Sequence, residues 1–269
     1  MERLLVIKLD AVDCEAEARL NGVALARVNA ARPNLTMPVH EYTMAGINRL
    51  ELVVWPRAAH IPDRPALPPE PRMGDGKRAV QLRVLLPRTG SLADEGNARS
   101  LAQLDWAAPA GLAYEAPLLL TQDLQLPVNF PRWRWLDAPM TEPTPTLHAQ
   151  AMALLQSLGA DLAAGQAESF IAAARLRTEE LALAYQRRPE EETPRLHEHL
   201  LALHAAGRLK WQALTAEGLV LRSLAGGRLL ECLDAAGSPA LRTEPDADGR
   251  SFMMPMRLSA VEGKLYVLR

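Results

Sequence analysis

The fold follows from a proline-containing segment near the middle of the chain, DAPMTEPTPT at residues 137–146. Three prolines spaced by small and polar residues are typical of a semi-rigid linker, because proline fixes φ and favours extended backbone. Before this segment, hydrophobic and polar residues alternate with the two-residue period of strands, and after it the hydrophobic residues recur with a helical period. The change of period predicts two domains, residues 1–140 and residues 141–269.

Residues 1–140 are expected to form an antiparallel, jelly-roll-like β-sandwich. Strands are predicted over Leu4–Leu9, Ala16–Leu20, Val23–Val28, Leu50–Trp55, Val80–Leu86 and Leu118–Leu126. The dipeptide Asn21-Gly22 predicts a two-residue hairpin turn that pairs Leu20 with Val23 and Ala18 with Leu25. Residues 56–71 hold six prolines, which predicts a surface crossover or, alternatively, a lid or docking segment.

Residues 141–269 are expected to place three helices on one face of a curved antiparallel sheet. Helices are predicted over Leu147–Leu162, over Glu168–Arg188, and from Thr193 as N-cap and Pro194 as first helical residue to Gly207. An antiparallel meander follows, with strands over Leu219–Leu224, Arg228–Leu233, Ala240–Thr243, Phe252–Leu258 and Lys264–Arg269. The chain as a whole is therefore expected to belong to the α+β class.

Composition argues against several classes of partner. The chain has 30 basic and 32 acidic residues and a formal net charge of −2, which lacks the basic excess of a nucleic-acid binder. Its start has only a short apolar run before Lys8, and no uncharged stretch approaches the roughly 20 residues of a membrane helix. We therefore expect a cytoplasmic protein without nucleic-acid or membrane partners, and the preference for Arg over Lys is typical of a GC-rich bacterial genome.

Motifs for metal binding and catalysis are absent. His197, Glu198, His199 and His204 crowd one predicted helix, but their spacing does not let them share one ion. The sequence contains no nucleophile elbow, phosphate-binding loop or dinucleotide-binding glycine triplet, and two cysteines are too few for a disulfide scaffold or a four-thiolate site. We therefore predict no catalytic residue, metal or cofactor, which favours a protein that is not an enzyme.

The segment FPRWRW at residues 130–135 is the first candidate ligand site, because it concentrates aromatic side chains. In extended backbone, Trp133 and Trp135 would share one face, and Arg132 and Arg134 the other. The two indoles could form a stacking platform for sugar rings or bases, assisted by Arg134. Alternatively, both indoles fill the end of the sandwich or the domain junction.

A methionine-rich strand is the second candidate. Phe252, Met254, Met256 and Leu258 would share one side of their strand, the side expected beneath the helices. Phe252, Met254 and Met256 could line an adaptable apolar pocket or simply fill the core.

Two weak family resemblances accompany these patterns. The elements Leu20-Asn21-Gly22-Val23 and Gly46-Ile47-Asn48-Arg49-Leu50-Glu51-Leu52 resemble the galactose-binding-like jelly-roll module of family-2 glycoside hydrolases. That resemblance implies carbohydrate binding or a scaffold role and transfers no catalytic residue. The segment Val261-Glu262-Gly263-Lys264-Leu265-Tyr266-Val267 is similar to the last strand of the nuclear-transport-factor-2-like cone. This second resemblance implies a pocket beneath the helices that serves binding, homodimerisation or catalysis.

These observations favour a non-catalytic bacterial binding or assembly protein whose partner is a small molecule or another protein. One alternative is a hydrolase or isomerase that uses a pocket near Phe252, Met254 and Met256. The other is a carbohydrate-binding protein that uses Trp133 and Trp135.

Overall fold

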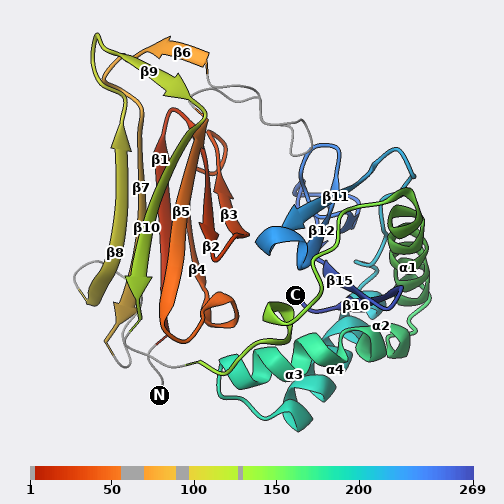
Figure 1. The fold of residues 1–269 in the computed structure, drawn as a ribbon. Coiled ribbons are helices and arrows are strands. Elements are labelled where there is room, and N and C mark those ends of the chain that lie inside the picture. Colours follow the sequence, from red (N-terminus) through yellow and green to blue (C-terminus); the bar gives the residue numbers. More distant parts are fainter. Residues whose placement is uncertain (1–3, 56–69, 89–96, 127–129) are drawn as a thin grey trace. The chain divides into compact units, whose positions relative to one another are not determined.

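The computed structural model describes residues 4–55, 70–88, 97–126 and 130–269 (Figure 1). Contacts divide the chain into a first unit that ends at Arg132 and a second unit that begins at Trp133. Strands and helices are both abundant and the sheets are antiparallel, which is compatible with the expected α+β class. No sheet of the described residues combines strands from both units.

The first unit contains two four-stranded antiparallel sheets, with strand orders β4-β1-β7-β8 and β10-β5-β2-β3 (Figure 1). Their strands are β1 (Val6–Val12), β2 (Glu15–Leu20), β3 (Val23–Val28), β4 (Asn34–Pro38), β5 (Ile47–Trp55), β7 (Ala79–Pro87), β8 (Ala98–Ala107) and β10 (Leu118–Gln125). Alternate residues of β1 and β5, including Ile7, Leu9, Leu50 and Leu52, are fully buried. Each sheet therefore contributes one hydrophobic face to the core of this unit.

The β2–β3 hairpin shows where the predicted register was right and where it was wrong. Leu20 pairs with Val23 as expected, but Ala18 pairs with Ala26 instead of Leu25. The register shifts between Ala18 and Arg19, because a bulge adds one residue to β3. A bulge leaves no signal in the alternation of side chains near the turn, so the Asn21-Gly22 pattern could not show it.

A small two-stranded sheet pairs β6 (Glu70–Met73) with β9 (Ala113–Ala116). Pro71 is compatible with β6 because this strand has a partner on one side only. Most of the proline-rich stretch 56–71 lies outside the described residues. The two expectations for it, a surface crossover and a lid or docking segment, therefore concern residues that the structure does not describe. Strands β4, β6, β8 and β9 had no counterpart in the sequence prediction.

The second unit packs its helices against one face of an antiparallel sheet of order β11-β12-β15-β16 (Figure 1). The helices are α1 (Pro145–Ala163), α2 (Glu168–Ala173), α3 (Arg175–Ala184) and α4 (Pro189–Ala205). The sheet strands are β11 (Leu219–Leu224), β12 (Leu229–Asp234), β15 (Arg257–Val261) and β16 (Lys264–Val267), and a separate pair joins β13 (Leu241–Arg242) to β14 (Met253–Met254). Leu155, Phe170, Leu200 and Leu258 belong to the core between the helices and the sheet.

Two helix predictions were wrong in their boundaries. The helix expected over residues 168–188 is broken at Ala174, whose ψ of 3° departs from helical geometry. No proline or glycine marks this break, so sequence gave no warning of it. The last helix begins at Pro189, before the expected N-cap Thr193, and Pro194 lies inside it. Pro189 is as suitable as Pro194 for a first helical position, and the acidic residues 190–192 then occupy the first turn, where the helix dipole favours negative charge.

The strand expected over residues 252–258 was also wrong, because it is divided into β14 and β15. Pro255 lies between the two strands and cannot donate a backbone hydrogen bond. The expected orientation is confirmed, since Met254, Met256 and Leu258 belong to the core beneath the helices and Phe252 packs against it.

Candidate functional site

Trp133 and Trp135 are packed inside the protein. Their exposed fractions are 0% and 1%, and the backbone of Arg134–Leu136 forms a short 3-10 turn instead of an extended strand. The Arg269 guanidinium carbon lies 5.7 Å from the centre of the Trp133 ring. In this conformation neither indole presents an open face on which a ligand could stack.

Arg134 attaches this segment to α3. Its Nη2 lies 2.9 Å from Glu179 Oε2, and its Nη1 donates a hydrogen bond to the Leu176 carbonyl. Its backbone N–H donates to Glu180 Oε1 at 2.7 Å. The guanidinium is thus already engaged by α3.

Met254 and Met256 are 6% and 1% exposed, and they fill the core. Phe252 is half-buried and lines a pocket of about 310 Å³. We call this cavity the Phe252 pocket. It is lined by Ala206, Gly207, Arg208, Lys210, Thr243, Glu244, Pro245, Asp246, Arg250 and Phe252. Of the sequence candidates, the structure therefore brings only Phe252 to this pocket.

The first wall of the Phe252 pocket is the segment that leaves α4. Gly207 adopts a left-handed conformation with φ of 66°, and the backbone N–H groups of Gly207 and Arg208 donate to the carbonyls of His204 and Leu203. This arrangement closes the helix. Leu209 is then buried in the core while Arg208 and Lys210 on either side of it are exposed, as expected for alternating positions of extended backbone.

The second wall follows β13 and is fixed by main-chain pairing. Trp211 forms an antiparallel bridge with Thr243, and the Glu244 N–H donates to the Lys210 carbonyl at 2.7 Å. The Thr243 N–H donates to the Phe252 carbonyl, and the Phe252 N–H donates to Thr243 Oγ1, both at 2.9 Å. Three segments that are distant in sequence therefore meet in a fixed register around the pocket.

The Phe252 ring provides an apolar surface within this wall. Its centroid lies 6.3 Å from the Trp211 ring and 6.4 Å from the His199 ring. These contacts support the ring from two sides and leave it half-buried. An apolar group of a ligand could pack on its remaining exposed surface.

Cationic side chains line the same pocket. Arg208 and Lys210 are exposed, and in the part of the chain that the structure describes neither side chain has a hydrogen-bond or ion-pair partner. The Arg250 side chain is 80% exposed, and its one ion pair with another described residue joins Nη1 to Asp248 Oδ2 at 3.9 Å. The pocket thus offers positive charges that no ion pair among the described residues neutralises, apart from the long Arg250 contact.

Two carboxylates also line the Phe252 pocket. Asp246 Oδ1 accepts the backbone N–H groups of Asp248 and Arg250, at 3.0 and 2.8 Å, and so closes the turn that ends at Gly249 and Arg250. Glu244 is exposed at the rim. Three cationic and two anionic side chains give the lining a formal charge of +1.

A shallow depression of about 380 Å³ in the first unit is a second cavity. It is lined by Asp10, Val12, Ala79, Val80, Gln81, Asp105, Trp106 and Ala107. Both oxygens of Asp105 already accept side-chain amides, from Gln81 at 2.8 Å and from Gln103 at 2.6 Å. The Phe252 pocket is the stronger candidate because its cations have no such partners.

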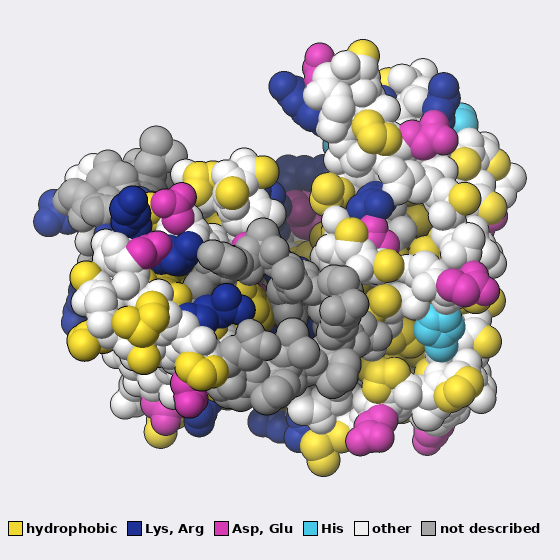
Figure 2. Space-filling model, turned by 90° about the horizontal axis from the view of Figure 1, so that it is seen from above, with side chains coloured by type: hydrophobic (Ala, Val, Ile, Leu, Met, Phe, Trp, Pro, Cys, Tyr) yellow, Lys and Arg dark blue, Asp and Glu magenta, His cyan; other side chains and the backbone are white. Residues whose placement is uncertain are grey.

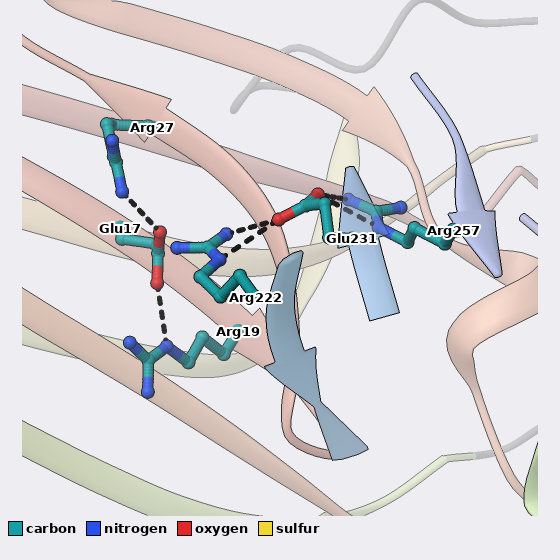
Figure 3. A network of polar contacts seen from close by, with 6 residues as sticks. All are labelled: Glu17, Arg19, Arg27, Arg222, Glu231 and Arg257. Atoms are coloured by element: carbon teal, nitrogen blue, oxygen red, sulfur yellow. Dashed lines mark hydrogen bonds and ion pairs between the residues drawn. The ribbon is translucent and has the colours of Figure 1, made fainter. Parts of the chain in front are cut away.

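Each unit also contains a carboxylate held between two arginines (Figure 3). In the first unit, the fully buried Glu17 pairs with Arg19 at 2.7 Å and with Arg27 at 2.9 Å. Both carboxylate oxygens are therefore occupied, which suits a structural role.

In the second unit, Glu231 is 7% exposed and binds two arginines from neighbouring strands (Figure 3). Arg222 approaches one carboxylate oxygen at 2.6 Å, and Arg257 approaches the other at 2.9 Å. These ion pairs link β11 and β15 to β12. Both carboxylate oxygens of Glu231 are engaged, so neither is free for acid–base chemistry.

The remaining candidates for chemistry are clusters of metal-binding side chains and the two cysteines. The described residues contain no group of three or more His, Cys, Asp or Glu side chains that could hold a metal ion. Burial raises the pKa of Cys14 to about 11 and that of Cys232 to about 12, so both are thiols at neutral pH. None of the described helices combines the length and apolarity needed to cross a membrane.

Positive and negative side chains are mixed on the one face drawn in Figure 2. On the face seen in Figure 2, Lys and Arg side chains are interspersed with Asp and Glu side chains, and hydrophobic side chains occur singly or in small groups. This face shows no extended area of one sign, in agreement with the formal net charge of −2.

Sequence reasoning missed Arg208, Lys210 and Arg250. The one local signal was the alternation Arg208-Leu209-Lys210 directly after the helix-ending Gly207, which predicts two cations on one side of an extended segment. The opposite wall comes from residues more than thirty positions later, and no sequence pattern showed that pairing.

No protein-family model matches this chain, and comparisons with curated proteins and with solved structures find no significant match. The two family resemblances seen in the sequence therefore remain expectations. Function has to be argued from the geometry of the site.

Proposed function

We propose that the protein is a non-catalytic binding protein whose partner is a small molecule held in the Phe252 pocket. The observation that carries this proposal is a half-enclosed cavity in which Arg208 and Lys210, both without partners among the described residues, accompany a half-buried aromatic ring. Small-molecule sites combine apolar walls with a few convergent polar groups in this way. The cavity lies at the lower end of the usual range of about 300–1,000 Å³, which favours a small ligand.

A binding role fits this lining better than catalysis does. Neither His nor Cys lines the pocket, and the carboxylate of Asp246 is engaged by its own turn. Two of the three cationic side chains are arginines, whose guanidinium groups offer several N–H donors to an anion. The lining is therefore suited to recognising charge.

The domain organisation and the cellular location expected from the sequence belong to the same proposal. We infer that the two contact-defined units are separate domains, a β-sandwich and a helix-on-sheet domain, in a cytoplasmic bacterial protein. The buried state of Trp133 and Trp135 gives no support to carbohydrate stacking on their rings.

The test fills the cavity with a large side chain. Ala206 lines the Phe252 pocket, whereas its exposed neighbour Ala205 does not, so A206W and A205W form a matched pair. The full chain is incubated with a small-molecule extract of bacterial cells, washed, and analysed for bound compounds by mass spectrometry, while circular dichroism checks the fold. We expect wild type and A205W to retain a compound that A206W loses.

Two results would contradict the proposal. If folded A206W retains the same compound as wild type, the binding site lies elsewhere. If wild type retains nothing from any extract, the pocket is not a small-molecule site under cellular conditions.

A further inference from the structure

We infer that the ligand of the Phe252 pocket is an organic anion in which a carboxylate or phosphate group is attached to a single flat ring. This inference rests on the proposed function, because it names the chemistry of the molecule bound at that site. It follows from the charges of the pocket, from the position of Phe252, and from the size of the cavity.

Elsewhere in the second unit, the basic side chains are mostly engaged by the protein itself. Most of its arginines bind carboxylates or carbonyls, as Arg134, Arg222 and Arg257 do. In the described residues of this unit, the basic side chains with no hydrogen bond or ion pair are Arg208, Lys210 and Lys264. Two of these three line the same cavity.

The acidic side chains of the lining do not neutralise this charge. Asp246 and Glu244 leave a formal charge of +1 against Arg208, Lys210 and Arg250. Neither carboxylate pairs with Arg208 or Lys210 in the structure. An anionic group on the ligand would therefore gain charge-assisted hydrogen bonds and would not displace an existing ion pair.

Phe252 provides an aromatic surface at the wall of the pocket. Its ring is supported by Trp211 and His199 and stays half-buried at the pocket wall. Aromatic surfaces favour flat partners in offset or edge-to-face arrangements. A cavity of about 310 Å³ accommodates one ring with its acidic group more readily than a larger ring system.

The cations have a competing structural explanation. Arg208 and Lys210 follow the C-terminus of α4, where positive charge complements the helix dipole. The last carbonyls of the helix, however, already accept the N–H groups of Gly207 and Arg208. The dipole explanation predicts that neutralising the two side chains changes stability only, whereas the ligand explanation predicts that it changes binding.

The experiment measures the binding of defined probes to the full chain by calorimetry. The anionic probes are phenyl phosphate and benzoate, benzamide is the neutral analogue, and inorganic phosphate lacks a ring. We expect at least one anionic ring compound to bind about 10-fold or more tightly than benzamide and inorganic phosphate. The ratio between phenyl phosphate and benzoate identifies the acidic group.

The variants test the assigned residues. The double variant R208M/K210M should weaken binding of the preferred probe by about 10- to 100-fold, because hydrogen bonds to charged groups are lost. K264M removes an exposed, unpaired lysine outside the pocket and should bind as wild type does. Thermal unfolding of each variant reports any separate effect on stability.

Several outcomes would overturn the inference. Binding of benzamide as tightly as the anions, unchanged binding by R208M/K210M, or no binding of either anionic ring compound would each do so. The proposed function fails separately, when A206W and wild type retain the same compound or wild type retains none. If wild type retains a neutral compound that A206W loses, the ligand is not an anion, but the Phe252 pocket is still the binding site.

Discussion

Replacing Glu180 by Gln is expected to destabilise the second unit strongly, because Glu180 neutralises a buried arginine. Glu180 lies on α3, and its Oε2 is 2.5 Å from Arg269 Nη1. The Arg269 side chain is fully buried and that of Glu180 is 7% exposed. The other oxygen, Oε1, accepts the backbone N–H of Arg134, so one carboxylate joins three segments.

The size of the effect follows from the loss of charge without loss of volume. E180Q can still accept the Arg134 N–H, but its amide cannot neutralise Arg269. Leaving one member of a buried ion pair uncompensated costs about 3–5 kcal/mol of unfolding free energy. With a urea dependence of about 2 kcal/mol per M, the unfolding midpoint of the second unit should fall by about 2 M.

The assay is urea unfolding followed by hydrogen exchange and mass spectrometry, which separates peptides of α3 from peptides of the first unit. Glu179 supplies the matched control, because it is the neighbouring residue and its ion pairs with Arg134 and Arg175 are partly exposed. E179Q should cost less than about 1 kcal/mol.

Equal, small effects of E180Q and E179Q would refute the reasoning, since Arg269 would then tolerate the absence of its partner. A double variant, E180Q/R269M, provides the second check. It removes the positive charge as well and keeps an acceptor for the Arg134 N–H, so it should recover much of the stability lost in E180Q.

Three further predictions concern other parts of the molecule. Asn48 is fully buried and makes side-chain hydrogen bonds to Met44, Gly46 and Asn21, so N48A should lower the unfolding free energy of the first unit by about 2–4 kcal/mol in urea titrations. The raised pKa values of the two buried cysteines predict that a thiol reagent at pH 8 modifies neither in the folded protein and both in denaturant; rapid modification of native protein would contradict this. Burial raises the pKa of Glu179, but hydrogen bonds from its two arginine partners outweigh burial and keep the pKa below its usual 4.5. Its small stabilisation should therefore be present above pH 4.5 and disappear as pH falls through the lowered pKa, which a comparison of wild type and E179Q stability against pH will show.

The elements that sequence predicted well are those whose determinants are local. The turn residues Asn21 and Gly22 both have positive φ, as the hairpin prediction required, and β11 has the expected bounds, Leu219–Leu224. The break at Ala174 and the bulge in β3 depend on packing and pairing with distant residues. No rule of local sequence could have located either one.

For the candidate ligand residues too, sequence shows local features but not contacts with distant residues. An aromatic-rich segment predicted a site at Trp133 and Trp135, but such a pattern cannot distinguish exposed from buried indoles, and both are buried. Phe252 does line a cavity, but its sequence neighbours did not predict which residues line that cavity with it. Its supporting ring, Trp211, reaches it through the bridge to Thr243, which is a tertiary pairing.

The position of the cations in the Phe252 pocket follows from one buried leucine. Leu209 is 4% exposed and fixes the side of the chain that faces the core, so Arg208 and Lys210 must point away from it. The Glu244 N–H donates a hydrogen bond to the Lys210 carbonyl, and this bond holds the second wall of the pocket next to the first. Hydrophobic burial and backbone pairing therefore place the backbone that carries both cations without help from a ligand. A ligand bound as we propose would meet two cations already gathered at one cavity. The backbone of both walls is already ordered, so the conformational entropy lost on binding would come mainly from the long side chains of Arg208 and Lys210.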